Sequence, residues 1–236
     1  FCDFSLTKKN TLDYLQHIKE ACSISRYRKK FYQIRKFLNY IEVGWLDNLD
    51  VPDEPETKTK RITSKDFKKA LHHFSDHDYY LQIKSILLLG ASSGLRAEEL
   101  YQLNPDDIDF EKRVVYVNHD PANGQTTKTK KSRIAFFNEE AQETLQEYIS
   151  CYRDYGFQYL FVQEHMQHIF HEYSLKVKYL RKFFSQEWDR CGGPTGIKKI
   201  LMGHSLKGDV DLNHYNAQSE EDLKRIYANV NVTVLA

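Results

Sequence analysis

Apolar residues recur at three- and four-residue steps along most of the chain, which is the pattern of amphipathic helices. In the first fifty residues this pattern predicts helices over 11–22 and 25–42. The second helix carries an apolar stripe made of Tyr27, Phe31, Ile34, Leu38 and Ile41. The amino-terminal part is therefore expected to be helical.

The same spacing predicts further helices after residue 60. One begins at Thr63, where Asp66 completes a capping box. The next begins near His77, is apolar on most sides and should be buried, and a short helix follows Arg96. Later helices are expected over 138–149, 174–188 (with Ser174 as cap) and 195–202, and from Ser219 onward, where Asp222 completes a second capping box.

Two segments instead favour strands. Residues 113–118 and 132–137 are rich in β-branched and aromatic side chains, and a turn and the lysine-rich segment 126–131 separate them. They predict a small antiparallel sheet with a lysine-rich edge or turn. The expected fold class is mainly α with a small antiparallel β-sheet (α+β).

A break in the pattern predicts a domain boundary. Residues 51–61 hold two prolines, three acids and then alternating cations, which is typical of a linker. We expect a helical, DNA-binding domain over 1–56, a linker over 57–61 and a second domain over 62–236.

Composition narrows the class of protein only a little. The net charge is +1, which does not by itself indicate a nucleic-acid binder, so local clusters of cations must carry that argument. The four cysteines lie far apart and form no metal-binding or disulfide pattern, which fits a reducing, cytoplasmic setting. No apolar run reaches membrane-spanning length, so no membrane partner is expected.

The helix predicted over 25–42 combines its apolar stripe with a run of cations. Arg26, Lys29, Lys30 and Lys36 belong to this run, and no acid interrupts it. Such a helix can pack one face and offer the other to a phosphate backbone. A solvated basic face is the alternative.

A second set of residues would suit a phosphodiester. Lys178 and Arg181 are three residues apart and so share one face of a helix, a Gly203-His204 turn follows, and Tyr215 lies in a polar stretch. Cations hold phosphate oxygens and a phenol can attack phosphorus. The alternative for each residue is an ordinary surface role.

His165, His168 and His171 are spaced by three residues, as metal ligands can be. Without a partner carboxylate in a clear scaffold, three such histidines are more often incidental. No metal site is predicted.

Taken in order, the blocks SSGLRAEELYQL, TKTKKSRIAFF, KYLRKFF, LMGHS and HY resemble those of the tyrosine recombinase (phage integrase) family. The chain is more narrowly similar to the integrases of archaeal viruses and plasmids. The resemblance covers about 63–227, and the basic helices before it resemble that family's core-binding domain. No single block is specific, but five in this order are.

The resemblance implies a set of catalytic residues, which are Arg96, Lys128, Lys178, Arg181, His204 and Tyr215. Glu99 matches the acidic residue that accompanies the first arginine. Lys128 has a rival in Lys130, which with Lys131 is also expected to bind DNA. The family usually has histidine where Lys178 stands, so a proton-transfer role there is in doubt and a phosphate contact is retained.

The implied activity is site-specific recombination of DNA. Tyr215 would attack the scissile phosphate and form a 3′-phosphotyrosyl link, while Arg96 and Arg181 hold the non-bridging oxygens and Lys128 protonates the leaving 5′-oxygen. His204 and Lys178 would support the phosphate or assist proton movement. Since the phosphotyrosine conserves the bond energy, neither ATP nor a metal cofactor is implied.

The implied partners are double-stranded DNA attachment sites and, on DNA, further copies of the chain in a homo-tetramer, with a monomer or weak oligomer off DNA. The apolar side of the helix after Ser219 is a candidate for packing on a neighbouring subunit or on its own domain. Two other functions remain open, a type IB topoisomerase-like nicking and rejoining activity and a DNA-binding relic without cleavage. Convergence of the catalytic residues would argue against the relic.

Overall fold

The computed structural model describes residues 6–45, 53, 59–152, 159–205 and 218–235. The chain divides into two compact units, Phe1–Thr59 and Lys60–Ala236. The linker predicted over 57–61 lies partly outside the described residues. The assignment of a DNA-binding domain to the first unit stays a prediction.

The described part of the first unit is a pair of helices, α1 (Lys8–Ala21) and α2 (Ile24–Tyr40). Thr7 caps α1, because its hydroxyl accepts the Asn10 N–H at 3.2 Å. The two helices pack through a small apolar cluster of Leu15, Ile18, Tyr27 and Phe31. Both predicted helices are confirmed, with ends that differ by one to three residues.

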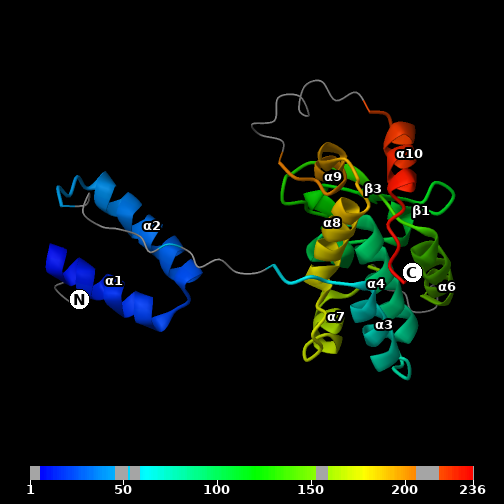
Figure 1. The fold of residues 1–236 in the computed structure, drawn as a ribbon, viewed down its shortest axis with the longest axis horizontal. Coiled ribbons are helices and arrows are strands. Elements are labelled where there is room, and N and C mark those ends of the chain that lie inside the picture. Colours follow the sequence, from blue (N-terminus) through cyan, green and yellow to red (C-terminus); the bar gives the residue numbers. More distant parts are fainter. Residues whose placement is uncertain (1–5, 46–52, 54–58, 153–158, 206–217, 236) are drawn as a thin grey trace. The chain divides into compact units, whose positions relative to one another are not determined.

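The second unit is built around α4 (Tyr80–Ser93), in which Ile83 and every residue over 85–93 are buried. Helices α6 (Glu139–Tyr152) and α8 (Leu180–Arg190) pack on it, and α3 (Ser64–His73) lies beside it (Figure 1). The predicted buried helix is therefore confirmed. It begins three residues later than expected because the His77 ring accepts the Tyr79 N–H and forms a turn there.

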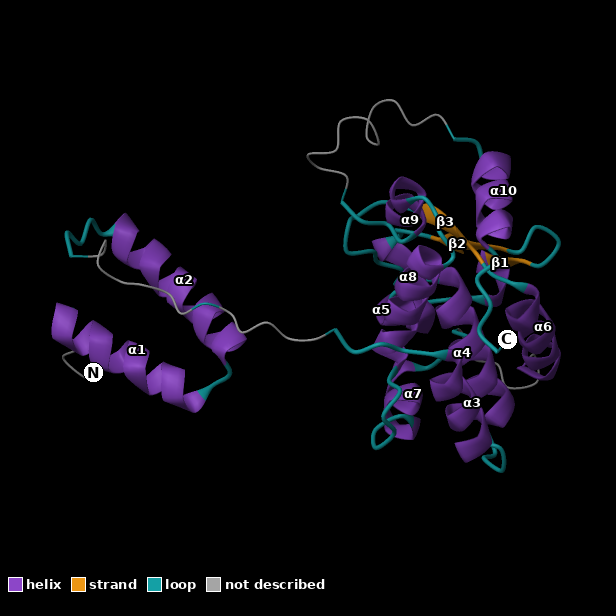
Figure 2. Ribbon diagram, in the orientation of Figure 1, coloured by secondary structure: helices purple, strands orange, loops and turns teal. Residues whose placement is uncertain are grey.

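A three-stranded antiparallel sheet lies beside this helical core (Figure 2). Its strands β1 (Ile108–Asp109), β2 (Val114–Val117) and β3 (Arg133–Phe136) are paired in the order β1-β2-β3. Tyr116 pairs with Ile134 in the β2–β3 ladder. The two predicted strands are confirmed, and the two-residue β1, which follows the 3₁₀ turn η2 (Pro105–Asp107), was not predicted.

A second apolar cluster joins the sheet to the last helices. Helices α9 (Thr195–Leu201) and α10 (Glu220–Val230) pack with the sheet around Trp188, which is fully buried. The predicted capping box at the start of α10 is present, with Ser219 and Asp222 as its members. Leu223 and Val230 are buried in this cluster, so the apolar side of α10 packs on its own unit.

The helix predicted over 174–188 is partly wrong. The chain forms a 3₁₀ turn, η5 (Val177–Tyr179), before α8 begins at Leu180, and Ser174 does not cap it. The Lys176 ammonium donates hydrogen bonds to the carbonyls of Phe170 and His171, at the end of α7 (Gln163–Ile169). This tether holds Lys176 in an extended conformation, which delays the start of the helix.

The second unit also contains a 3₁₀ turn, η3 (Pro121–Asn123), in the hairpin between β2 and β3. A short helix, α5 (Ala97–Tyr101), follows α4. Within the described ranges, every helix is too short or too polar to cross a bilayer. The predicted fold class, mainly α with a small antiparallel sheet, is confirmed.

Candidate active site

Arg96 stands where the chain leaves α4 and enters α5. Gly94 ends α4 with φ +67, and a Cβ there would meet the Phe184 ring at 2.4 Å, so only glycine fits. The Arg96 guanidinium donates to the Glu99 carboxylate at 2.8 Å and to the Gly203 carbonyl at 2.9 Å. Arg96 thereby connects α5 with the turn that follows α9.

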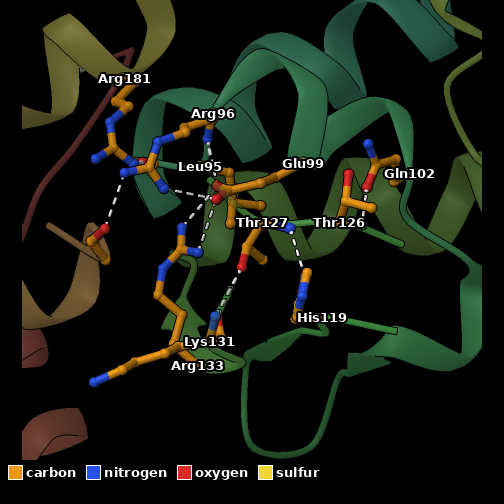
Figure 3. A network of polar contacts seen from close by, with 12 residues as sticks. Leu95, Arg96, Glu99, Gln102, His119, Thr126, Thr127, Lys131, Arg133 and Arg181 are labelled. Atoms are coloured by element: carbon orange, nitrogen blue, oxygen red, sulfur yellow. Dashed lines mark hydrogen bonds and ion pairs between the residues drawn. The ribbon is translucent and has the colours of Figure 1, made fainter. Parts of the chain in front are cut away.

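Glu99 is buried and accepts bonds from two arginines (Figure 3). The Arg133 guanidinium, on β3, donates to both carboxylate oxygens of Glu99, at 2.9 and 2.7 Å. The backbone N–H of Arg96 donates to Glu99 Oε2 at 2.7 Å. Burial raises the pKa of the Glu99 carboxyl, but the hydrogen bonds and charges of Arg133 and Arg96 outweigh it and leave the pKa below its ordinary value. Glu99 is therefore an anion that orients two guanidinium groups.

Arg181 comes from the first turn of α8 and donates to the Gly94 carbonyl at 2.8 Å. Figure 3 shows its guanidinium beside that of Arg96. Burial, and then the positive charge of Arg96, lower the pKa of Arg181 to about 10. Like charges held this close favour a bound anion, which would relieve their repulsion.

His204 follows Gly203, which has φ +62 and ends α9. The His204 N–H donates to the Lys199 carbonyl at 2.9 Å and the Gly203 N–H to the Ile200 carbonyl at 2.9 Å, which fixes the turn. Partial burial and the charges of Arg181 and Arg96 lower the pKa of the His204 imidazole. His204 thus belongs to the same cluster as the two arginines.

Lys128 lies on the loop between β2 and β3 and is exposed, with no hydrogen-bond or ion-pair partner among the described residues. The loop is fixed by its neighbours instead. The Thr127 hydroxyl accepts the Lys131 N–H at 3.1 Å and donates to the Lys131 carbonyl at 3.0 Å, while the Thr127 N–H donates to the His119 ring at 3.1 Å. Lys130 and Lys131 are also exposed on this loop.

No contact among the described residues joins Lys178 to the cluster of Arg96, Arg181 and His204. Lys178 is exposed, and its ammonium stands 5.3 Å from the centre of the Tyr179 ring. Lys178 lies on η5 and Arg181 in the first turn of α8 directly after it, and the shared face expected for them stays a prediction.

Tyr215 lies outside the described residues, within 206–217. Two rival tyrosines are described, and both rings are held by contacts inside the protein. Tyr227 is 7% exposed, its hydroxyl donates to the Ser92 carbonyl at 2.9 Å, and burial raises its pKa. Tyr173 is half-buried and stacked on His73, with ring centres 4.8 Å apart.

The cations predicted on the amino-terminal helices are placed on the surface of α2. Arg26, Lys29, Lys30 and Lys36 are all exposed, whereas the buried residues Tyr27, Phe31 and Leu38 form the opposite side. The helix therefore has the two faces that its sequence predicts.

Of the histidines on and after α7, His165 is placed against an aromatic side chain. The His165 ring stands edge-on to Tyr79, with ring centres 4.3 Å apart. Burial and the nearby His77 and His168 lower the pKa of His165. In the part of the chain that the structure describes, no three His, Cys, Asp or Glu side chains are arranged to hold a metal ion.

Sequence reasoning missed Arg133 as a member of this site. Its one available signal was its place as the second residue of the strand predicted over 132–137, just after the lysine-rich segment. The structure brings Arg96, Glu99, Arg133, Arg181 and His204 together, with three guanidinium groups around one carboxylate. The resulting excess of positive charge and N–H donors suits a phosphate group.

The comparisons with solved structures show a shared fold at low sequence identity. The Tn1549 transposon integrase in complex with circular intermediate DNA has a TM-score of 0.66 at 17% identity, with 94% of this chain and 84% of that chain covered. XerA recombinase gives a TM-score of 0.51 at 19% identity, with 97% and 85% covered. XerH bound to its difH substrate gives 0.55 at 13% identity, with 92% and 65% covered.

Sequence comparison identifies the family. No curated protein sequence matches the chain. The model of the phage integrase family matches residues 60–221, which is most of the chain and includes every residue of the arginine cluster. The narrower likeness to archaeal viral and plasmid integrases stays a prediction. The chain belongs to the phage integrase family of tyrosine recombinases.

Proposed function

We propose that Arg96, Arg181 and His204 bind the scissile phosphate of duplex DNA, in a site-specific recombinase that integrates or excises a mobile element. The observation that carries this proposal is the cluster of guanidinium groups, in which the partly buried Arg181 lies beside Arg96 with its pKa lowered to about 10. Guanidinium forks match the non-bridging oxygens of a phosphate and stabilise the charge that develops in a pentavalent transition state.

Tyr215 is proposed as the nucleophile. Its phenol gives up its proton to solvent, its oxygen forms a bond to phosphorus, and the bond from phosphorus to the 5′-oxygen breaks, which leaves a 3′-phosphotyrosyl link and a free 5′-hydroxyl. Lys128 supplies the proton that the leaving 5′-oxygen takes up. The burial of Tyr227 and the hydrogen bond of its hydroxyl to the Ser92 carbonyl support Tyr215 over that rival.

Rejoining is the reverse of the same step. The 5′-hydroxyl of the partner strand attacks the phosphotyrosine, so the energy of the phosphodiester is kept and neither ATP nor a metal ion enters the reaction. His204 supports the phosphate, and Lys178, exposed on η5, contributes a phosphate contact rather than a proton.

The proposed assembly is a homo-tetramer on two DNA attachment sites, formed from monomers or weak oligomers inside the host cell. One chain supplies one set of catalytic residues, whereas recombination requires four strand cleavages. Two of the matched Tn1549 integrase structures are complexes with DNA, which supports DNA as the partner here. The first unit is proposed to be the core-binding domain, with the cations of α2 on the phosphate backbone.

A covalent-trapping experiment tests this proposal. The full chain is incubated without metal with a pool of randomised duplexes, each nicked so that cleavage releases a short fragment and prevents rejoining. The expected result is a protein–DNA adduct that survives denaturant, and sequencing the trapped DNA gives the preferred site. Tyr215→Phe should abolish the adduct, and Tyr227→Phe, which removes only the bond to Ser92, should keep it.

The outcomes separate the alternatives. An adduct that survives Tyr215→Phe would assign the nucleophile to another residue. Tight binding to the same DNA without any adduct would favour a DNA-binding relic. Relaxation of supercoiled DNA by a monomer that joins no second site would favour a type IB topoisomerase-like activity.

A further inference from the structure

Arg133 is a buried arginine whose contacts are all made inside the protein. Its side chain is 10% exposed, and both terminal nitrogens donate to Glu99. Its third nitrogen donates to the Leu201 carbonyl at 3.0 Å, two residues before Gly203. Arg133 therefore joins the strand that follows the Lys128 loop to α5 and to the end of α9.

The Glu99 carboxylate has two partners, and this affects the charge of the site. Arg96 donates one side-chain bond to Glu99, whereas Arg133 donates two. If Glu99 had only Arg96 as a partner, a buried ion pair of zero net charge would form and would compete with any anion for Arg96. With Arg133 present, the carboxylate is already compensated, and Arg96 keeps its charge for an external anion.

The turn before His204 adds a second link. Arg96 holds the Gly203 carbonyl and Arg133 holds the Leu201 carbonyl, so both guanidinium groups reach the same turn from opposite sides of Glu99. A Cβ at Gly203 would lie 2.8 Å from Arg133 Cδ, which shows how closely the side chain follows the backbone there.

We propose that Arg133 is a positioning residue for phosphate binding, because it neutralises Glu99 and so leaves Arg96 free to bind the phosphate. This inference rests on the proposed function, since it concerns the same anion site. An ion pair with a purely structural role would stabilise the fold but would not change the affinity of the folded protein for an anion.

Inorganic phosphate tests this without any DNA sequence. The full chain is labelled with ¹³C in its histidines, and phosphate is titrated while the imidazole signal of His204 is followed by NMR. His204→Gln assigns the signal by its absence. The parent is expected to give a saturable shift. Arg133→Gln should weaken phosphate binding by about tenfold or more, because it leaves Glu99 free to compensate Arg96.

Three further variants complete the design. Arg133→Lys keeps the positive charge and should bind phosphate within about threefold of the parent. The double variant Glu99→Gln/Arg133→Gln removes both charges together and should also return to within about threefold. Arg113→Gln is the matched control, since it breaks an exposed ion pair to Glu139 at 2.7 Å and should leave phosphate affinity unchanged.

Thermal unfolding of each variant shows that the protein is folded during the titration. Parental phosphate affinity in folded Arg133→Gln would overturn the inference while leaving the anion site intact. If Arg133→Gln does not fold, the phosphate affinity of the double variant Glu99→Gln/Arg133→Gln tests the inference instead. Phosphate binding by this variant about tenfold weaker than that of the parent would overturn the inference. Absence of any saturable shift in the parent would overturn the anion site and this inference with it.

Discussion

At the scale of single residues, Lys128 differs from the arginines because the protein fixes the loop around it and leaves its side chain exposed. Thr127 is bonded on both sides, and the Thr126 N–H donates to the Gln102 side chain at 2.6 Å, which ties the loop to the residue after α5. A lysine on a fixed loop can reach a bound substrate without first breaking an ion pair. This arrangement suits a proton donor better than a structural cation.

Replacing Lys128 by alanine should slow DNA cleavage by about 10²- to 10⁴-fold, the usual contribution of a general acid, with little change in DNA affinity. The measurement is single-turnover formation of the covalent adduct on the selected nicked duplex. A substrate with sulfur in place of the leaving 5′-oxygen should restore the rate, because a thiolate leaves without a proton.

Lys130→Ala is the control for this prediction, since Lys130 is exposed on the same loop and is the rival for the same role. It should lower DNA affinity slightly and show no recovery with the sulfur substrate. Rescue of Lys130→Ala rather than Lys128→Ala would reverse the two assignments.

At the scale of elements, the turn after α9 determines where His204 stands. Gly203 has φ +62, a region that costs a residue with a Cβ about 1–2 kcal/mol. Gly203→Ala should therefore destabilise the fold by more than that amount, because its Cβ also displaces Arg133, and should reduce cleavage for the same reason. Unfolding in denaturant measures the first effect, and adduct formation at a temperature where the variant is folded measures the second.

Gly192→Ala is the matched comparison. Gly192 has φ +73 but nothing within 4 Å of its added Cβ, so this variant is destabilised only by the positive φ of its backbone. It should lose about 1–2 kcal/mol of stability, less than Gly203→Ala, while cleaving DNA at the parental rate. Equal losses of cleavage in both variants would mean that the contact between Gly203 and Arg133 does not matter for the reaction.

How much the sequence predicts depends on the range of the interactions. The capping boxes at Thr63 and Ser219 involve residues three positions apart, and both predicted helix starts are confirmed. The start of α8 was misplaced because Lys176 is held by carbonyls of the preceding segment, which periodicity does not detect. β1 was missed because two residues give no alternation.

The candidate site, too, divides into residues that the sequence predicts and contacts between distant residues that only the fold shows. Arg96, Arg181 and His204 come together as the resemblance implied, although 85 and 23 residues separate the successive members in the printed sequence. Arg133 and its bonds to Glu99 and Leu201 required the fold, because a bond between residues 68 positions apart leaves no local pattern. Lys178 lies on the 3₁₀ turn that runs directly into α8, and its place in the site stays a prediction.

At the scale of the whole molecule, the charge is nearly balanced, with 34 Lys and Arg against 33 Asp and Glu. DNA binding must therefore depend on where the cations are placed rather than on net charge. The exposed cations of α2 lie in the first unit, and the arginine cluster lies in the second. We expect the first to supply affinity for the phosphate backbone and the second to supply the chemistry.

The salt dependence of DNA binding tests this division. Lys29 and Lys30 are adjacent and exposed on α2, and replacing both by alanine should remove up to two phosphate contacts. Each lost contact should lower the slope of log K against log salt by about 0.9, and affinity should fall similarly for different DNA sequences. Fluorescence anisotropy at several salt concentrations gives the slope.

Lys68 and Lys69 are the matched pair, adjacent and exposed on α3, and their replacement should leave the slope unchanged. A slope that changes equally for both pairs would show that α2 has no special role, whereas a change confined to Lys29 and Lys30 with normal cleavage at low salt would separate binding from catalysis.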